Sequence, residues 1–243
     1  MSVFRFKRFE VVNERSAMKV NTDGVLLGAA MSVRPQDRTL LDIGTGTGTI
    51  ALMAAQRLME IDADAQIRVD AIDIDEPSAV EAAANFARSP WAERMHAHNL
   101  SLDDFAASGE WKYDMIFSNP PYFEDSLTAP DERKSTARHT SEGLSYRDIF
   151  EFAAERLTPQ GRVSLVLPAD QEAGVCRYAR MCGLHLFRIL RIRTVTRKAP
   201  ARIIVEFSRE RCIEPADDIL TIQDEGKYTE EYLSLTHDFY LFA

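Results

Sequence analysis

Residues 119–122 read Asn-Pro-Pro-Tyr and have the clearest chemical potential in the chain. They follow an apolar run, residues 115–117, that indicates the end of a buried strand. The side-chain oxygen of Asn119 and the backbone carbonyl of Pro120 can each accept one N–H of an NH2 group. Because the lone pair of an adenine or amide nitrogen is delocalised, two such acceptors would help to aim it at a methyl donor.

The rest of the tetrad fits a planar substrate. Pro120 and Pro121 both fix φ, which makes the loop stiff. Tyr122 offers a flat face on which a base can stack, and we assign Phe123 to the same substrate-binding surface. The alternative interpretation is that the two prolines only end a strand. A second motif upstream argues against it.

This second motif is a glycine loop, residues 44–48, between an apolar run that includes Asp42 and a helical pattern from residue 49. Gly44, Gly46 and Gly48 let the backbone approach a ligand closely. Their Gly-x-Gly-x-Gly spacing differs from the Gly-x-Gly-x-x-Gly of dinucleotide folds. Asp42 would repel a pyrophosphate but attract a cation. The pattern therefore predicts S-adenosylmethionine as cofactor, whereas the alternative is a structural turn.

A second acidic strand end lies about 25 residues beyond the glycine loop, close to the spacing of Rossmann folds. Asp73 ends this strand, and we expect it to bind the ribose hydroxyls of the cofactor. Asp75, just before Glu76 and Pro77, is typical of a helix N-cap instead.

The pattern of elements predicts an α/β fold. Expected strands cover residues 38–43, 67–73, 94–98, 113–118, 161–167, 185–195 and 201–208, and expected helices cover 48–60, 77–87, 145–157 and 170–181. This alternation predicts a Rossmann-like, mostly parallel seven-stranded sheet with helices on both faces. The last two strands have no helix between them and should form an antiparallel hairpin. Ligands of such sheets bind at the carboxyl ends of the strands, where the glycine loop, Asp73 and Asn119 fall.

Composition is consistent with one globular domain. The chain has 243 residues, 45% of them hydrophobic, and its longest apolar runs are too short to span a membrane. We expect a cytoplasmic protein, with an N-terminal covering segment 1–35, a core 36–208 and a C-terminal appendage 209–243. Three cysteines without Cys-x-x-Cys spacing indicate neither disulfides nor zinc. His96 and His98 lack a third ligand at suitable spacing, so no metal is expected.

The chain resembles the bacterial tRNA1(Val) adenine-37 N(6)-methyltransferase family, which belongs to the class I methyltransferases. Besides the two motifs, the resemblance covers residues 6–9, 18–28, 137–139 and 228–232. It implies that Lys19, Thr22 and Asp23 contact the methionine end of the cofactor. The same residues also suit a helix start.

One position departs from the pattern of related enzymes, which often carry Asp after the third strand to bind the adenine amine of the cofactor. Here that position is Asn99, whose side-chain oxygen can still accept a hydrogen bond. The sequence leaves open whether Asn99 or Asp103 makes this contact.

The distribution of charge bears on the substrate. The net charge of -9 argues against nucleic acid, but salt screens charges over about 8 Å, so local patches decide. Residues 188–202 hold six basic side chains and no acid, and residues 4–9 alternate basic and aromatic side chains. Expected RNA contacts are Arg191, Arg193, Arg197 and Lys198, together with Arg138 and His139 after the tetrad. Each of these basic segments, considered alone, is more typical of a solvated surface.

Three alternatives to tRNA adenine methylation share parts of this sequence pattern. Release-factor glutamine methyltransferases share the tetrad but carry a helical domain before the glycine loop, and only about forty residues precede it here. The second-best interpretation is a guanine-amine ribosomal RNA methyltransferase, although such enzymes typically have Phe as the fourth residue of the tetrad. A non-catalytic RNA-binding protein on the same fold would be expected to lack Asn119 or Asp42. The sequence leaves the oligomeric state open, and a monomer is compatible with it.

Overall fold

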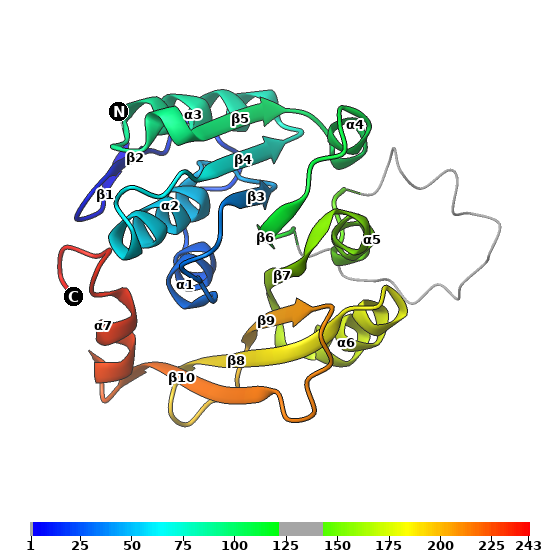
Figure 1. The fold of residues 1–243 in the computed structure, drawn as a ribbon. Coiled ribbons are helices and arrows are strands. Elements are labelled where there is room, and N and C mark those ends of the chain that lie inside the picture. Colours follow the sequence, from blue (N-terminus) through cyan, green and yellow to red (C-terminus); the bar gives the residue numbers. More distant parts are fainter. Residues whose placement is uncertain (1, 122–142) are drawn as a thin grey trace.

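The computed structural model describes residues 2–121 and 143–243. Within these residues, nine strands form one mixed sheet in the order β11-β10-β8-β9-β7-β6-β3-β4-β5, and β1 and β2 form a separate hairpin (Figure 1). The strands are β1 Val3–Arg5, β2 Glu10–Val12, β3 Thr39–Ile43, β4 Arg68–Asp73, β5 Met95–Asn99, β6 Tyr113–Ser118, β7 Leu157–Pro168, β8 His185–Val195, β9 Arg202–Ser208, β10 Ala216–Asp224 and β11 Lys227–Tyr228. The α-helices are α1 Thr22–Ala30, α2 Thr49–Ile61, α3 Glu76–Arg88, α4 Leu102–Ala107, α5 Tyr146–Arg156, α6 Glu172–Met181 and α7 Glu230–Thr236, and short 3-10 helices cover Ala92–Arg94 and Ala169–Gln171.

The predicted fold class is confirmed. All seven predicted strands pair in one sheet, and β8 and β9 form the expected antiparallel hairpin. The sheet is larger than predicted because β10 pairs in parallel with β8, and β11 pairs with β10. The four predicted helices correspond to α2, α3, α5 and α6, whereas α4, α7 and the β1–β2 hairpin were not predicted.

Two apolar cores lie on opposite faces of the sheet because successive strand residues point to opposite sides. On β3, Leu40 belongs to the core beneath α1, α2 and α3, and Leu41 belongs to the core beneath α5 and α6. Central strands β3, β6 and β7 are buried on both faces, as expected for parallel strands. Their carboxyl ends therefore sit on a rigid platform.

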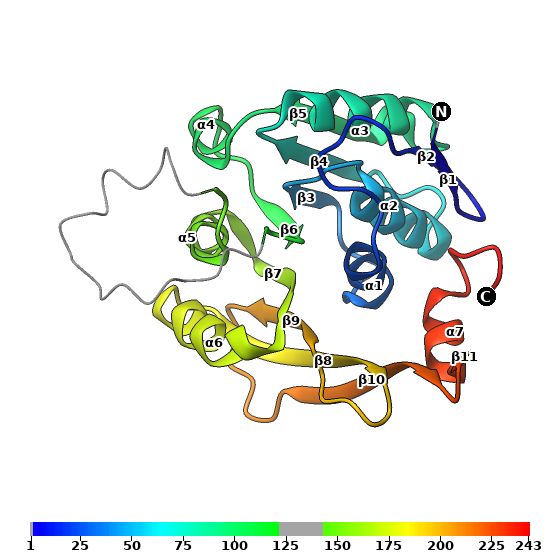
Figure 2. The same ribbon diagram turned by 180° about the vertical axis from the view of Figure 1, so that it is seen from behind.

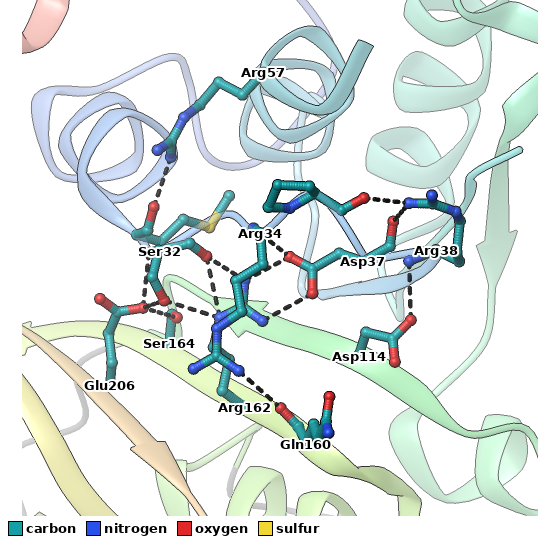
Figure 3. Close-up of polar contacts among 12 residues, drawn as sticks. Ser32, Arg34, Asp37, Arg38, Arg57, Asp114, Gln160, Arg162, Ser164 and Glu206 are labelled. Carbon is teal, nitrogen blue, oxygen red and sulfur yellow. Dashed lines mark hydrogen bonds and ion pairs between the residues drawn. The ribbon is translucent and has the colours of Figure 1, made fainter. Parts of the chain in front are cut away.

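A buried polar cluster fixes the C-terminal end of α1 to the sheet (Figure 3). The fully buried Arg162 guanidinium on β7 donates to the Asp37 carboxylate at 2.6 and 2.9 Å and to the Ser32 carbonyl. Oε2 of Glu206 on β9 accepts hydrogen bonds from the Ser32 backbone and hydroxyl and from the Ser164 hydroxyl. Because buried charges need such partners, this cluster sets where α1 lies, and the other end of α1 reaches the site described next.

The β1–β2 hairpin lies next to the C-terminal segment that follows α7 (Figure 2). The Lys7 backbone donates to the Phe239 carbonyl at 2.8 Å, and the rings of Phe6 and Tyr240 stack at 6.0 Å. This contact fixes the N-terminal hairpin, from which the chain continues toward the glycine loop.

Candidate cofactor and substrate site

The glycine loop connects β3 to α2 with three residues in the left-handed region. Gly44, Gly46 and Gly48 have φ values of 70°, 57° and 81°. At these angles a side chain would strain the backbone. A Cβ at Gly48 would lie 2.5 Å from the Phe86 ring of α3, so glycine is also required there by packing. The loop thus presents backbone, not side chains, at the carboxyl end of β3.

Asp42 lies beneath this loop and is completely buried. Its Oδ2 accepts a hydrogen bond from the Thr45 hydroxyl at 2.8 Å, while its Oδ1 makes no hydrogen bond with the described residues. Burial raises the pKa of the Asp42 carboxyl to about 7, although the Thr45 hydrogen bond opposes that shift. An unsatisfied buried carboxylate oxygen is costly unless a cation or a donor comes near.

Asp73, at the carboxyl end of β4, holds the glycine loop from the other side. Its Oδ2 accepts from the Gly46 backbone N–H at 2.8 Å, and its Oδ1 accepts from the Asp75 backbone N–H at 2.9 Å. Burial raises the pKa of Asp73, and these two hydrogen bonds act against the rise. Asp75 caps α3 through the Ser78 backbone, as its sequence context indicated.

Asn99 ends β5, in register with Asp73. Its side-chain amide donates at 3.0 Å to the backbone carbonyls of Asp73 and Ile74. This leaves the acceptor oxygen of Asn99 as the group that would meet a ligand amine, and that contact stays a prediction. Asp103 lies exposed in the first turn of α4.

The segment before α1 crosses the glycine loop. A Cβ on Gly46 would lie 3.4 Å from the Ser16 hydroxyl and 3.6 Å from the Met18 carbonyl oxygen. Asn21, not Thr22 or Asp23, caps α1, because its side chain accepts from the Gly24 backbone N–H. Asp23 instead receives a hydrogen bond from Arg202 of β9 at 2.8 Å.

Asn119 follows β6 and is 8% exposed. Its Nδ2 lies 3.5 Å from the Met18 sulfur. Pro120 is buried beside it, and Pro121 is exposed. Tyr122, Phe123, Arg138 and His139 lie outside the described residues, so their assigned roles stay predictions.

One pocket unites several predicted positions. Its lining includes Lys19, Gly44, Gly46 and Asn119, from three separate parts of the chain. The other predicted cofactor residues do not line this pocket, namely Gly48, Asp42, Asp73, Asn99, Thr22 and Asp23. Sequence reasoning missed eight described lining residues, namely Met18, Val20, Asn21, Gly24, Thr45, Thr47, Thr49 and Ile50. The threonines alternate with the glycines of the loop, which was the available signal.

The pocket suits S-adenosylmethionine on chemical grounds. The glycine loop brings backbone to its wall, and an unsatisfied oxygen of Asp42 lies behind Thr45. A cationic ligand favours a carboxylate nearby, and Asp73 offers acceptor oxygens at the next strand end. The residues present therefore fit the predicted cofactor.

The basic segment 188–202 meets acids from other elements. Arg191 forms ion pairs with Glu172 at 2.7 Å and with Asp217 at 2.8 Å, and Arg193 donates to the Thr221 hydroxyl. In contrast, Arg197 and Lys198 are exposed in the β8–β9 loop. Whether any of these side chains contacts RNA stays a prediction.

The fold and the site define a class I S-adenosylmethionine-dependent methyltransferase. Among solved structures, a methyltransferase from Pyrococcus furiosus is similar with a TM-score of 0.57 at 21% identity, over 82% of this chain and 89% of that one. The T. thermophilus 16S rRNA N2 G1207 methyltransferase, solved with AdoMet and guanosine, has a TM-score of 0.55 at 19% identity, over 86% of this chain and 50% of that one.

Sequence relatives are closer and extend over the full chain. The model of the methyltransferase small domain matches residues 15–176. The tRNA1(Val) (adenine(37)-N6)-methyltransferase of Parabacteroides distasonis is 41% identical over 98% of this chain and 97% of the relative. The protein of the same name from Tolumonas auensis is 37% identical over 98% and 96%. The chain belongs to the methyltransferase small domain family, and its cofactor is S-adenosylmethionine.

The described residues contain no group of three or more His, Cys, Asp or Glu side chains placed to hold a metal ion. None of their helices is long and apolar enough to cross a membrane.

Proposed function

We propose that this enzyme methylates N6 of adenine 37 in tRNA1(Val). Curated relatives that carry this name are 36–41% identical over nearly the whole chain. The observation in the structure that supports the proposal is the position of Asn119, which is 8% exposed and lines the same pocket as Gly44, Gly46 and Lys19. An amide acceptor beside a cofactor pocket suits an exocyclic amine as the methyl acceptor.

The residues around the pocket have separate tasks in this proposal. S-adenosylmethionine, when bound, supplies an electrophilic methyl group. Asp73 and the glycine loop hold the cofactor, with Lys19 at the pocket wall. Oδ1 of Asn119 and the carbonyl of Pro120 accept the two N–H groups of the target amine, which turns its lone pair toward the methyl group. By resemblance, Tyr122 stacks on a base that has been flipped out of the anticodon loop, with Pro121 and Phe123 beside it.

The surface beside the pocket supports an RNA substrate. Asp23 in the first turn of α1 pairs with Arg202 at the start of β9, so the β8–β9 loop lies next to the pocket. Arg197 and Lys198 in that loop are exposed and suited to phosphate contacts. Arg138 and His139 are proposed as further contacts from the sequence alone. With tRNA as its substrate, the enzyme is proposed to work in the cytoplasm.

Methyl transfer to synthetic tRNA1(Val) tests this function. We expect N6-methyladenosine in digests of the wild-type reaction, and none when guanine replaces adenine 37. Asn119→Ala should bind the cofactor normally but lose on the order of a hundredfold in turnover, since removing a preorganised polar partner costs about 3 kcal/mol. Asn119→Asp keeps the acceptor oxygens and should stay partly active.

Two outcomes would overturn the proposal. Methylation of guanine in ribosomal RNA but not of tRNA would favour the guanine-amine alternative. Turnover of Asn119→Ala close to the wild-type rate would remove Asn119 from the mechanism.

Tyr122→Phe should have a mild effect on turnover, whereas Tyr122→Ala should cost roughly 1–3 kcal/mol in base placement.

A further inference from the structure

The N-terminal strap, residues 13–21, is anchored on α3 by one buried carboxylate. Glu81 is 4% exposed. Its Oε2 accepts hydrogen bonds from the backbone N–H groups of Glu14 and Arg15 at 2.9 and 2.8 Å, and its Oε1 accepts from Ser16 at 3.1 Å. Three backbone donors compensate the cost of burying this carboxylate. The strap is therefore tied to α3 just before it crosses the glycine loop.

Further hydrogen bonds fix the strap around Met18. The Ser16 hydroxyl donates to the Met18 carbonyl at 2.9 Å, and the Val20 backbone donates to Oδ1 of Asn13 at 3.2 Å. Ser78 of α3 reaches the same turn, because its hydroxyl donates to the Ser16 hydroxyl at 3.1 Å. Although the Met18 residue is 41% exposed, its side chain leaves from a backbone that is held on both sides.

The Met18 side chain contacts Asn119 at the pocket. The sulfur of Met18 lies 3.5 Å from Nδ2 of Asn119, and both residues line the pocket. A thioether can accept a hydrogen bond but cannot donate one. The Met18 sulfur therefore distinguishes the two ends of the Asn119 amide. The NH2 group can donate a hydrogen bond to the sulfur, whereas the amide oxygen would find no donor at that position. With the NH2 group on the Met18 side, the amide oxygen points to the other side.

We propose that Met18 is a positioning residue that fixes the orientation of the Asn119 amide, so that its oxygen faces the target amine. This inference rests on the proposed function of Asn119. An amide turned by 180° would present donors to a substrate NH2 group, and two sets of donors repel each other. Met18 removes that unproductive orientation before the substrate arrives.

A double-mutant cycle tests this role, and the quantity measured is the rate constant of methyl transfer under single-turnover conditions. Met18→Leu nearly conserves volume but removes the acceptor. In the wild-type background it should lower the rate about three- to tenfold, the size expected for one modest hydrogen bond. In the Asn119→Asp background it should change the rate less than about twofold, because Asp has no N–H to orient. Met181→Leu on α6, at a residue that is 74% exposed, is the matched control and should have no effect.

The cycle distinguishes a positioning role of Met18 from a packing role, and it also distinguishes failure of this inference from failure of the proposed function of Asn119. An equal loss from Met18→Leu in both backgrounds, or no loss in either, would overturn the positioning role. Full turnover by Asn119→Ala would overturn the function of Asn119 itself, which is a different result. A measurement independent of turnover is the NMR signal pair of the Asn119 side-chain NH2 group. One of its two proton shifts should move in Met18→Leu, and unchanged shifts would contradict the contact.

Discussion

The carboxylate of Asp73 accepts a hydrogen bond from the backbone N–H of Gly46 at 2.8 Å. This contact joins the carboxyl end of β4 to the loop that follows β3, so the predicted ribose-binding acid also shapes the glycine loop. The second oxygen of Asp73 is held by the Asp75 backbone at the start of α3. A single side chain thus couples two of the elements that form the site.

Asp73→Ala should therefore weaken the binding of S-adenosylmethionine for two reasons, loss of the acceptor and release of the Gly46 loop. We expect a dissociation constant ten- to a hundredfold higher, which corresponds to roughly 1.5–3 kcal/mol for a charge-assisted contact. Asp73→Asn, which keeps one acceptor oxygen, should fall between Ala and wild type. Calorimetry is the measurement, and wild-type affinity in Asp73→Ala would remove Asp73 from the cofactor site.

Arg197 and Lys198 should account for more of the RNA affinity than Arg191. Replacing both with Gln should lower the slope of log affinity against log salt by about 1.5–2 units, since each phosphate contact releases counterions. Arg191→Gln should leave that slope nearly unchanged, because its guanidinium is already paired with Glu172 and Asp217. Filter binding over a range of salt concentrations distinguishes these outcomes, and a larger slope change in Arg191→Gln would reverse this assignment.

Local patterns in the sequence were sufficient for the strands and helices that carry the site. The apolar run before Asn119 and the glycine loop after Asp42 each lie within a single segment, and the structure has them at neighbouring strand ends. The strand patterns at residues 185–195 and 201–208 likewise located β8 and β9. Such signals depend on neighbours in the chain, and for this reason they could be read directly.

Contacts between distant segments could not be read in this way. The stretch 188–202 contains no acid, yet Arg191 is paired with Glu172 and Asp217, which come from α6 and β10. Strand β10 carries acids at residues 217 and 218 that obscure its strand pattern, and its pairing with β8 joins residues that are far apart in the chain. Glu81 resembled any polar residue of an amphipathic helix until the fold placed three backbone N–H groups against it.

The buried Asp42 should make stability depend on pH. Its pKa is raised by burial to about 7 from its usual 3.8, so between those values the folded state keeps a proton that the unfolded state has lost. The contribution of this group to the free energy of unfolding should therefore fall as pH rises from about 4 to about 7, by on the order of 1.4 kcal/mol per pH unit, and then level off.

Asp42→Asn, which cannot titrate, supplies the comparison. The stability of Asp42→Asn relative to wild type should increase across that pH range and stay constant above it. Saturating S-adenosylmethionine should reduce the dependence, because a nearby cation favours the carboxylate. Urea unfolding at a series of pH values measures both effects. A difference between the two proteins that is independent of pH would show that Asp42 does not retain its proton in the folded state.

Glu81 should control how firmly the N-terminal strap covers the glycine loop. Glu81→Gln is nearly isosteric, but its amide has an acceptor at one end and an NH2 group at the other. The NH2 group must face either Ser16 or the pair Glu14 and Arg15, so at least one backbone N–H loses its acceptor. We expect faster hydrogen exchange at residues 14–16 and a three- to tenfold weaker affinity for S-adenosylmethionine, since Lys19 and Asn21 of the strap line the pocket. Glu76→Gln, at an exposed residue in the first turn of α3, is the control and should change neither quantity. If Glu81→Gln exchanged no faster than wild type at residues 14–16, the strap would have to be held by its other contacts.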